Sequence, residues 1–292
     1  MAAGLKPALT SDRKRAPACP AQVGFLPFGI AFNPSTEHEE LMAKQPFIGT
    51  CRLCREEAAL VDSHIVPAFL FRPLKEVEGR YSILSTDPSE RERTGQRGIT
   101  ERLLCRVCDN ERLQRYEDHL ARVLNGGIGL RIQTGSNVLQ VQGYDYRLIK
   151  NAAISMLWRI ILSRAPMFKE VSLAPLYEER LRDVLLNNLK VGEDEFAVAV
   201  TAPLLEGRHF PDWTVSPDFI PVGENNLYRF LVTGLLFTVE VGPGAPVAEM
   251  GPMVLREREW RIPVMDVRMI PFLSTFCADV ADARKTRQQN KG

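Results

Sequence analysis

Four of the six cysteines form two pairs with the spacing of metal ligands. Cys51 and Cys54 make the first Cys-x-x-Cys pair, and Cys105 and Cys108 make the second. Each such turn points two sulfurs at one position, and two turns complete the tetrahedral shell that zinc prefers. Four thiolates leave no open coordination position, so we predict one structural Zn²⁺. The alternative is a disulfide or a redox pair.

One histidine stands between the two pairs. Residues 61–67 read Val-Asp-Ser-His-Ile-Val-Pro, with His64 at the centre. Because the unperturbed pKa of histidine lies near neutrality, an imidazole there could act as a general base. Two other roles stay open for His64. It could hydrogen-bond a helix end or a loop and lock the module, or it could be a zinc ligand.

The order of these motifs resembles the HNH endonuclease superfamily, whose zinc-stapled members carry a cysteine pair, a His-Ile-x-Pro segment and a second pair that opens a helix. The resemblance covers about residues 49–115. It implies a treble-clef (ββα-metal) module and metal-dependent hydrolysis of DNA or RNA phosphodiesters. His64 would be the general base. Mg²⁺ or Mn²⁺, held by Asp109 and by Asp62, would stabilise the leaving oxygen.

Three positions depart from the family pattern, so the catalytic motif is degenerate. Ser63 stands where the family usually has a metal-binding aspartate or histidine, and Asp109 stands where it has histidine or asparagine. The orienting asparagine has no clear counterpart between Tyr81 and Leu104. A function of another class therefore stays open. The module would then be a non-catalytic zinc scaffold that binds nucleic acid, or a protein partner through residues 130–292.

The elements that must position these residues can be read from apolar periodicity. The first cysteine pair is predicted to be a knuckle between short strands, and the second pair to open an amphipathic helix that ends at Gly126 and Gly127. His119 is expected to be partly exposed on that helix. Residues 81–84 are predicted as a strand and residues 87–98 as a loop. The helix has an apolar face made of Leu113, Tyr116, Leu120, Val123 and Leu124.

The rest of the chain predicts a second unit of helices and antiparallel strands. Helices are expected over 148–162, after Pro175 in its first turn, and over 272–283. Strands are expected over 138–141, 196–201, 228–233 and 235–241, with a bend or bulge at Gly234. The fold class is therefore α+β, divided into a disordered tail over 1–45, a zinc module over 46–129 and a second domain over 130–292. Translation from Met42 is the alternative to a genuine tail.

Bulk composition excludes few classes of protein. The 292 residues are 45% apolar and 25% charged, with a net charge of +1, which is ordinary for a soluble globular chain. Basic and acidic residues balance between Cys51 and Arg122, so charge alone does not indicate a nucleic-acid partner. No apolar run reaches the ~20 residues that span a bilayer. Paired thiols without other disulfide signals favour a reducing, cytoplasmic location.

Overall fold

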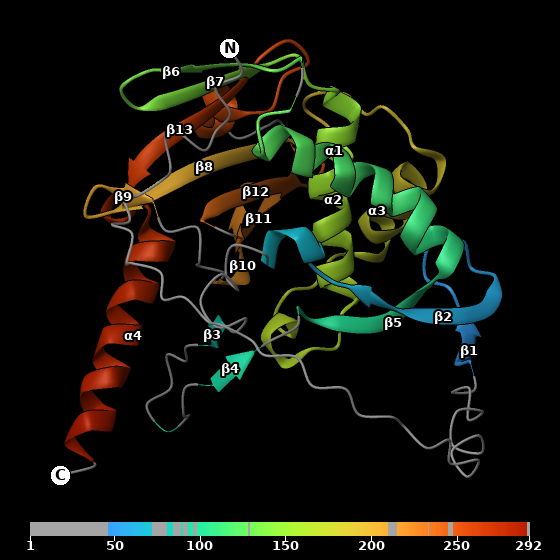
Figure 1. Cartoon of the computed structure of the whole chain (residues 1–292), viewed down its shortest axis with the longest axis horizontal. Helices are drawn as coiled ribbons and strands as arrows, with labels where there is room; N and C mark the ends of the chain where they lie inside the picture. Colours follow the sequence, from blue (N-terminus) through green and yellow to red (C-terminus); the bar gives the residue numbers. More distant parts are fainter. Residues whose placement is uncertain are drawn as a thin grey trace, which may run out of the picture.

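The computed structural model describes residues 46–71, 81–83, 89, 93–95, 98–127, 129–209, 215–232, 234–244 and 248–290. This part of the chain is a mixed α/β protein, consistent with the predicted α+β class (Figure 1). The predicted tail, residues 1–45, lies outside the described residues. Within the described ranges, no helix is both long enough and apolar enough to cross a membrane.

A three-stranded antiparallel sheet carries the cysteine pairs and His64. Its strands are β1 (Ile48–Thr50), β2 (Glu57–His64) and β5 (Thr100–Cys105), in the order β1-β2-β5. As predicted, the first cysteine pair lies in the turn between two short strands. The register of β2 and β5 shifts between Val61 and Ser63, so that Asp62 faces two residues of β5. Such a bulge re-aims the side chains on either side of it.

A hairpin lies in the insert between the two pairs. Its strands are β3 (Tyr81–Ile83) and β4 (Arg93–Gly95), which pair antiparallel. The strand predicted over 81–84 is thus confirmed for three residues. The loop predicted over 87–98 is wrong at 93–95, because these polar residues pair with β3 although they show no apolar alternation.

The large sheet has eight strands, in the order β10-β11-β12-β8-β13-β7-β6, with β9 attached to β8. All pairs are antiparallel except β13 with β8, which come from distant parts of the chain. Gly234 makes the tight bend between β11 and β12 with φ of +70°, a conformation that glycine adopts readily. The strands are β6 (Arg131–Thr134), β7 (Val138–Gln142), β8 (Val198–Leu205), β9 (Arg208–His209), β10 (Val215–Val222), β11 (Asn225–Val232), β12 (Leu235–Val241) and β13 (Trp260–Asp266).

Four of the strands in the large sheet were not predicted: β6, β9, β10 and β13. Pro217 and Pro221 interrupt β10, and Pro263 interrupts β13, and proline argues against a strand in a sequence. β10 is an edge strand, where a missing N–H does little harm, whereas β13 lies inside the sheet between β8 and β7 and pairs with both despite Pro263. Tertiary pairing therefore overrides a local signal that points away from strand.

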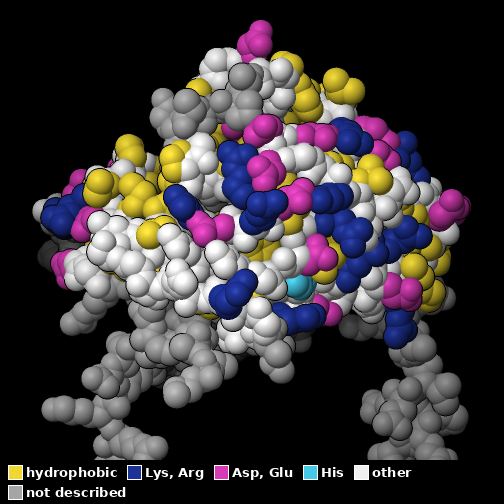
Figure 2. Space-filling model, turned by 90° about the horizontal axis from the view of Figure 1, so that it is seen from above, with side chains coloured by type: hydrophobic (Ala, Val, Ile, Leu, Met, Phe, Trp, Pro, Cys, Tyr) yellow, Lys and Arg dark blue, Asp and Glu magenta, His cyan; other side chains and the backbone are white. Residues whose placement is uncertain are grey.

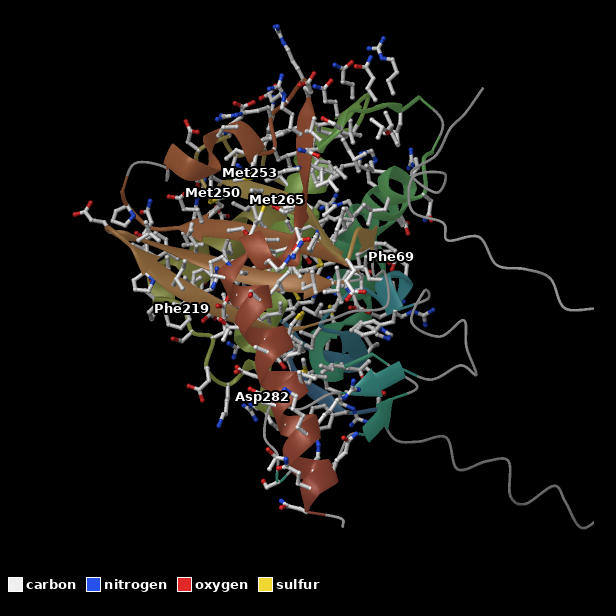
Figure 3. The ribbon with its side chains drawn as sticks, turned by 90° about the vertical axis from the view of Figure 1, so that its left-hand side faces the viewer. Phe69, Phe219, Met250, Met253, Met265 and Asp282 are labelled. Carbon is white, nitrogen blue, oxygen red and sulfur yellow. The ribbon has the colours of Figure 1, made fainter. Side chains whose placement is uncertain are left out.

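Four α-helices are described, and three of them form a layer beside the large sheet (Figure 1). They are α1 (Gln114–Leu124), α2 (Tyr146–Leu162), α3 (Pro175–Asn187) and α4 (Pro271–Gln289). Pro175 occupies the first turn of α3, as predicted. α4 is longer than the predicted 272–283, because the arginine, lysine and glutamine residues that follow are good helix formers. Figure 3 shows α4 running past the sheet, with Asp282 in its far half.

α2 is the centre of the core. It packs against α1, α3 and β12, and almost every one of its residues is buried, as its apolar composition predicts. One apolar cluster runs from Cys51 through α1 and α2 to Ile262 in β13. Residues 46–129 and 130–292 thus share this cluster. The expectation for His119 is wrong, since it is 8% exposed and its Nε2 accepts a hydrogen bond from the Asp145 N–H at 2.9 Å.

The packing of α3 generates a matched pair of predictions. Leu181 is fully buried, whereas Leu176 on the same helix is 74% exposed. We expect Leu181→Ala to lower the free energy of unfolding by about 2–5 kcal/mol, because it removes apolar contacts and leaves a cavity. Leu176→Ala should change it by less than about 0.5 kcal/mol. Urea denaturation monitored by circular dichroism measures both, and equal effects would contradict this packing.

Candidate functional site

The four paired cysteines converge on one point. All four Sγ atoms lie within 4.8 Å of one another, and the Sγ atoms of Cys54 and Cys105 are 3.9 Å apart. Zinc–sulfur bonds of about 2.3 Å in a tetrahedron place sulfurs about 3.8 Å apart. The cluster could therefore bind zinc, and its closed set of four thiols is that of a structural metal site. Cys277, on α4, is not part of the cluster.

Backbone hydrogen bonds hold the two pairs together. Within the first turn, the Arg55 N–H donates to the Cys51 carbonyl at 2.8 Å, and Arg55 adopts a left-handed φ of +67°. Between the turns, the Arg52 N–H donates to the Leu103 carbonyl at 2.9 Å, and the Cys105 N–H donates to Cys51 Sγ at 3.3 Å. These hydrogen bonds thus hold the two cysteine turns against each other.

The same contacts prepare one sulfur to carry negative charge. The hydrogen bond from the Cys108 thiol, together with the backbone N–H of Cys105, lowers the pKa of Cys51 to about 4. The pKa of Cys108 is raised, because Cys51 holds its proton and burial disfavours its charge. Burial also raises the pKa of Cys54. Metal ligands must be thiolates, and the hydrogen bonds within the cluster stabilise a thiolate at Cys51.

Helix α3 closes over the first cysteine turn. Arg182 Nη1 donates to the Leu53 carbonyl at 2.6 Å, and its guanidinium is held in turn by Glu179. Glu179 also pairs with Arg55, while Arg52 lies 3.4 Å from Glu178. Exposed pairs of this kind contribute little to stability individually. The buried carbonyl contact is the stronger tie between the cysteine module and the later part of the chain.

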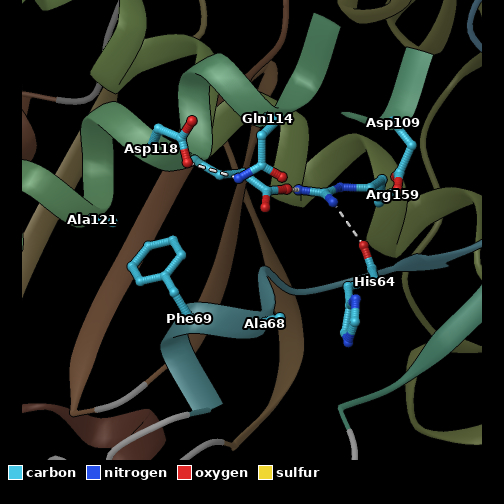
Figure 4. Close-up of a pocket in the computed structure, with 9 residues that line it drawn as sticks. His64, Ala68, Phe69, Asp109, Gln114, Asp118, Ala121 and Arg159 are labelled. Carbon is cyan, nitrogen blue, oxygen red and sulfur yellow. Dashed lines mark hydrogen bonds and ion pairs between the residues drawn. The ribbon is translucent and has the colours of Figure 1, made fainter. Parts of the chain in front are cut away.

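A cavity of about 260 Å³ opens between β2, η2 (Ala68–Phe71), α1 and α2 (Figure 4). Gln114, Asp118 and Ala68 are exposed, so the cavity is open to solvent. Two of the predicted site residues, His64 and Asp109, lie in its wall. The lining residues are His64, Ala68, Phe69, Asp109, Gln114, Glu117, Asp118, Ala121 and Arg159.

Arg159 forms the buried floor of the cavity, and its side chain is only 1% exposed. Its Nη1 donates to the His64 carbonyl at 2.7 Å, and its Nη2 lies 2.7 Å from a carboxylate oxygen of Glu117. Its Nε donates to the Ser155 carbonyl at 3.3 Å. The guanidinium therefore joins β2, α1 and α2, and it neutralises Glu117 inside the wall.

Asp109 lies half-buried in a π-helical segment, η4 (Cys108–Leu113), next to the last cysteine. Burial raises the pKa of its carboxyl, and the positive charge of Arg159 opposes that shift. Ser63 Oγ makes no hydrogen bond of ordinary geometry among the described residues, yet it faces Asp109 and also lowers the pKa of that carboxyl. Widened helical turns of this type recur at functional sites, where they re-aim a side chain.

His64 occupies the end of β2 with its imidazole directed away from Arg159 (Figure 4). The ring makes no hydrogen bond or ion pair with another described residue, and it lies against Gly98. A Cβ at Gly98 would approach Cδ2 of His64 to 3.3 Å and the ring of Phe71 to 2.9 Å, so a larger residue there would crowd both rings. The backbone of His64 is thus anchored, while its ring has no polar partner among the described residues.

The structure does not bring Asp62 to this group. Its carboxylate is 72% exposed and lies 3.3 Å from Arg102, across the bulge of β2 and β5. It is not among the residues that line the cavity. Asp62 stands one residue before Ser63, the position that the family pattern uses, and adjacent residues of a strand point to opposite faces: Ser63 is buried and Asp62 is exposed. Asp109, rather than Asp62, is the carboxylate near His64.

Sequence reasoning missed Arg159, Glu117 and Gln114 as members of the site. A signal for Arg159 exists, because a single arginine inside an otherwise apolar, buried helix needs a buried partner. Throughout the described ranges, the four cysteines are the one group of three or more Cys, His, Asp or Glu residues close enough to hold a metal ion. Within these ranges, no third metal-ligating side chain accompanies His64 and Asp109.

Comparison with known proteins adds no relative: no family model, no curated protein and no solved structure matches this chain. The resemblance to HNH endonucleases therefore depends on the motifs themselves.

The cysteine cluster predicts that the purified chain holds about one metal ion. We expect Cys108→Ser to lose that ion and to lower the melting temperature, because binding energy at a structural site is folding energy. Cys277→Ser is the matched control and should keep both the bound metal and the melting temperature of the parent chain. Elemental analysis together with a thermal scan in the presence and absence of a chelator measures this. Undiminished metal content in Cys108→Ser would exclude the site.

The buried guanidinium generates a second prediction. Arg159→Met leaves Glu117 and the His64 carbonyl unpaired, so we expect the free energy of unfolding to fall by about 3–5 kcal/mol. Adding Glu117→Leu should restore much of the loss, because it removes the uncompensated charge. Arg261→Met, at a 56% exposed position, should have little effect. Urea denaturation tests all three, and a double variant no more stable than Arg159→Met would contradict the pairing.

Proposed function

We propose that this chain is a zinc-stapled endonuclease of the HNH type that hydrolyses phosphodiesters of DNA or RNA. The proposed ion at the four cysteines is Zn²⁺, because four thiolates in a reducing compartment suit this metal best. The proposed module is a treble clef. A turn between β1 and β2 that carries one pair, and a helical segment that begins beside the other pair, support that arrangement.

One observation carries the proposal: His64 and Asp109 line the same solvent-open cavity, directly beside the cysteine cluster. They come from β2 and from η4, which are joined to the cysteine turns on either side. His64 has a ring without described polar partners, as a general base needs before substrate binds. A purely structural histidine would instead be expected to form hydrogen bonds from its ring nitrogens to nearby backbone groups.

The proposed chemistry is acid–base hydrolysis. The imidazole of His64 takes a proton from a water molecule, whose oxygen forms a bond to the phosphorus as the bond to the leaving oxygen breaks. The leaving oxygen takes up a proton, so that one water is consumed for each bond cleaved. The backbone contact from Arg159 fixes the position of His64 during this step. Such positioned proton transfer contributes about 10²–10⁴-fold in rate.

A divalent cation would supply stabilisation of charge on the leaving oxygen. Asp109 is the side chain that would hold Mg²⁺ or Mn²⁺, since Glu117 is already neutralised by Arg159. One carboxylate is a sufficient protein ligand for Mg²⁺, which usually keeps several waters and binds substrate phosphate oxygens as well. The residues present therefore fit a weakly preformed cation site that substrate completes.

The charge on the molecular surface is compatible with substrate binding that depends only weakly on electrostatic attraction. Figure 2 shows basic and acidic side chains interspersed over one face. Affinity for a nucleic acid would then depend less on counterion release than in strongly basic proteins. Substrate choice would depend more on local shape and on contacts to bases.

A second candidate is a non-catalytic zinc scaffold, and the edge strand β10 favours it. Phe219 and Ile220 of β10 are more than a third exposed, on the part of the chain expected to bind a protein partner (Figure 3). An edge strand can accept a further strand from a partner, although Pro217 and Pro221 reduce that tendency. On this reading, Arg159 and His64 belong only to the structural frame.

Cleavage assays separate the two candidates. Full-length protein is incubated with plasmid DNA and with structured RNA, with and without Mg²⁺ or Mn²⁺. We expect cation-dependent cleavage that falls about 10²–10⁴-fold in His64→Ala, because the general base is lost. Asp109→Asn should raise the cation concentration needed for half-maximal activity.

The control is Asp282→Asn, an exposed aspartate on α4, which should cleave like the parent. Metal content and melting temperature of each variant show whether the cysteine cluster is intact. Equal cleavage by His64→Ala and the parent, or no cleavage of either substrate by folded protein, would refute the nuclease and leave the scaffold.

A further inference from the structure

The cavity extends well beyond the proposed catalytic pair. In Figure 4, His64 and Asp109 lie at one side, whereas Phe69, Asp118 and Ala121 lie at the other. Four lining residues of α1, at positions 114, 117, 118 and 121, follow the spacing of one helical face. The chemistry proposed for His64 uses only one end. The other end therefore needs a separate explanation.

The far end combines an aromatic wall with hydrogen-bond acceptors. Phe69 is half-buried against the core and stacks on no other ring among the described residues. Gln114 Nε2 donates to Asp118 Oδ1 at 2.7 Å, which orients the amide because a carboxylate only accepts. Within the described ranges, Oδ2 of Asp118 and Oε1 of Gln114 have no partner. This end thus presents two acceptors beside the ring of Phe69.

The charges of the cavity narrow the class of ligand. Asp118 would repel an anionic group, so a phosphate is not expected at this end. Arg159, which is almost completely buried, disfavours a cationic ligand, even though Glu117 offsets part of its charge. A neutral, planar molecule with neighbouring N–H donors fits the aromatic wall and the acceptors together. The volume, about 260 Å³, is below the roughly 300–1,000 Å³ of drug-sized pockets and suits a single heterocycle.

Guanine is the nucleobase that matches these features. Its N1–H and exocyclic N2–H groups lie on one edge, where both can donate to a carboxylate, whereas adenine and cytosine each offer a single amino group on that edge. Bases are read in this way only when unpaired, by stacking on an aromatic ring and hydrogen-bonding at the Watson–Crick edge. A duplex base could reach the cavity only after leaving its stack.

We propose that the far end of the cavity is a nucleobase pocket, in which Phe69 stacks on an unpaired guanine and Asp118, held by Gln114, accepts hydrogen bonds from its N1–H and N2–H groups. The inference rests on the proposed function, because it places the neighbouring phosphodiester at His64. It makes the substrate a single-stranded or unpaired segment that contains guanine. Contacts to the base, rather than to the phosphate backbone, would then determine which substrate is bound. This agrees with the mixture of basic and acidic side chains on the surface.

Binding of short oligonucleotides tests the pocket. Full-length His64→Ala protein, which leaves substrate intact, is titrated with fluorescent single strands that carry one central guanine, inosine or adenine. We expect guanine to bind about ten-fold or more tightly than inosine, which lacks the N2 amino group, and than adenine. Adding Asp118→Asn should abolish that preference. Phe69→Ala should weaken all three strands about ten-fold, because stacking is independent of sequence.

Phe69→Leu keeps the apolar volume and separates lost stacking from lost folding, and Asp282→Asn serves as the exposed control. Unchanged guanine preference in Asp118→Asn would overturn the pocket. If the parent chain nevertheless cleaves in a His64-dependent manner, the proposed function survives without it. If guanine binding follows the prediction but nothing is cleaved, the pocket stands and the nuclease fails. Displacement of the strand by an arginine-rich peptide that needs Asp118 would overturn guanine in favour of a guanidinium ligand.

Discussion

The guanidinium of Arg159 is the contact on which the arrangement of the site depends. It extends from the central helix α2, supports the backbone of β2 at His64, and meets Glu117 on α1. Burying a charge costs several kcal/mol, so such a group is retained only where its partners compensate it. The guanidinium therefore holds β2, α1 and α2, which are separate in the sequence, in one geometry. Arg159 and Glu117, which form the charged pair, both line the cavity between these elements.

The cysteine cluster is a second constraint, next to Asp109 in η4. It fixes the two turns from which His64 and Asp109 follow, and α3 covers the first of these turns through Arg182. A second polar tie comes from Glu101, which accepts hydrogen bonds from the backbone N–H groups of Arg164 and Ala165 just after α2. The metal module and the helical layer thus support each other through contacts to backbone. Such contacts tolerate surface variation better than exposed ion pairs do.

Several features could be read directly from the sequence, each for a local reason. The cysteine spacing predicts the cluster because two Cys-x-x-Cys turns leave few other arrangements, and the apolar run of residues 148–162 predicts α2 because only a buried helix accommodates it. Pro175 and Gly234 mark a helix start and a hairpin bend through their own dihedral preferences. These features need no knowledge of distant residues.

The features that the sequence did not reveal depend on contacts between distant residues. β10 and β13 contain prolines and form because neighbouring strands pair with them, and His119 is buried because the Asp145 N–H needs an acceptor. Glu117 and His64, the partners of Arg159 on other elements, are separated from it by 42 and 95 residues along the chain, so no short window contains them. Asp62 is close to His64 in the sequence, yet its exposed carboxylate pairs with Arg102. Asp109, far from His64 in the sequence, reaches the same cavity from η4.

The strand order of the large sheet has a consequence for synthesis on the ribosome. The β6–β7 hairpin and the block formed by β8, β12, β11 and β10 are joined only through β13, which pairs with β7 on one side and with β8 on the other. β13 begins at Trp260, near the end of the chain. The cysteine turns leave the ribosome long before that, so they can enclose a metal while the sheet is still two separate pieces. During translation, the backbone N–H and C=O groups that β7 and β8 later share with β13 therefore stay unpaired until this last strand is made.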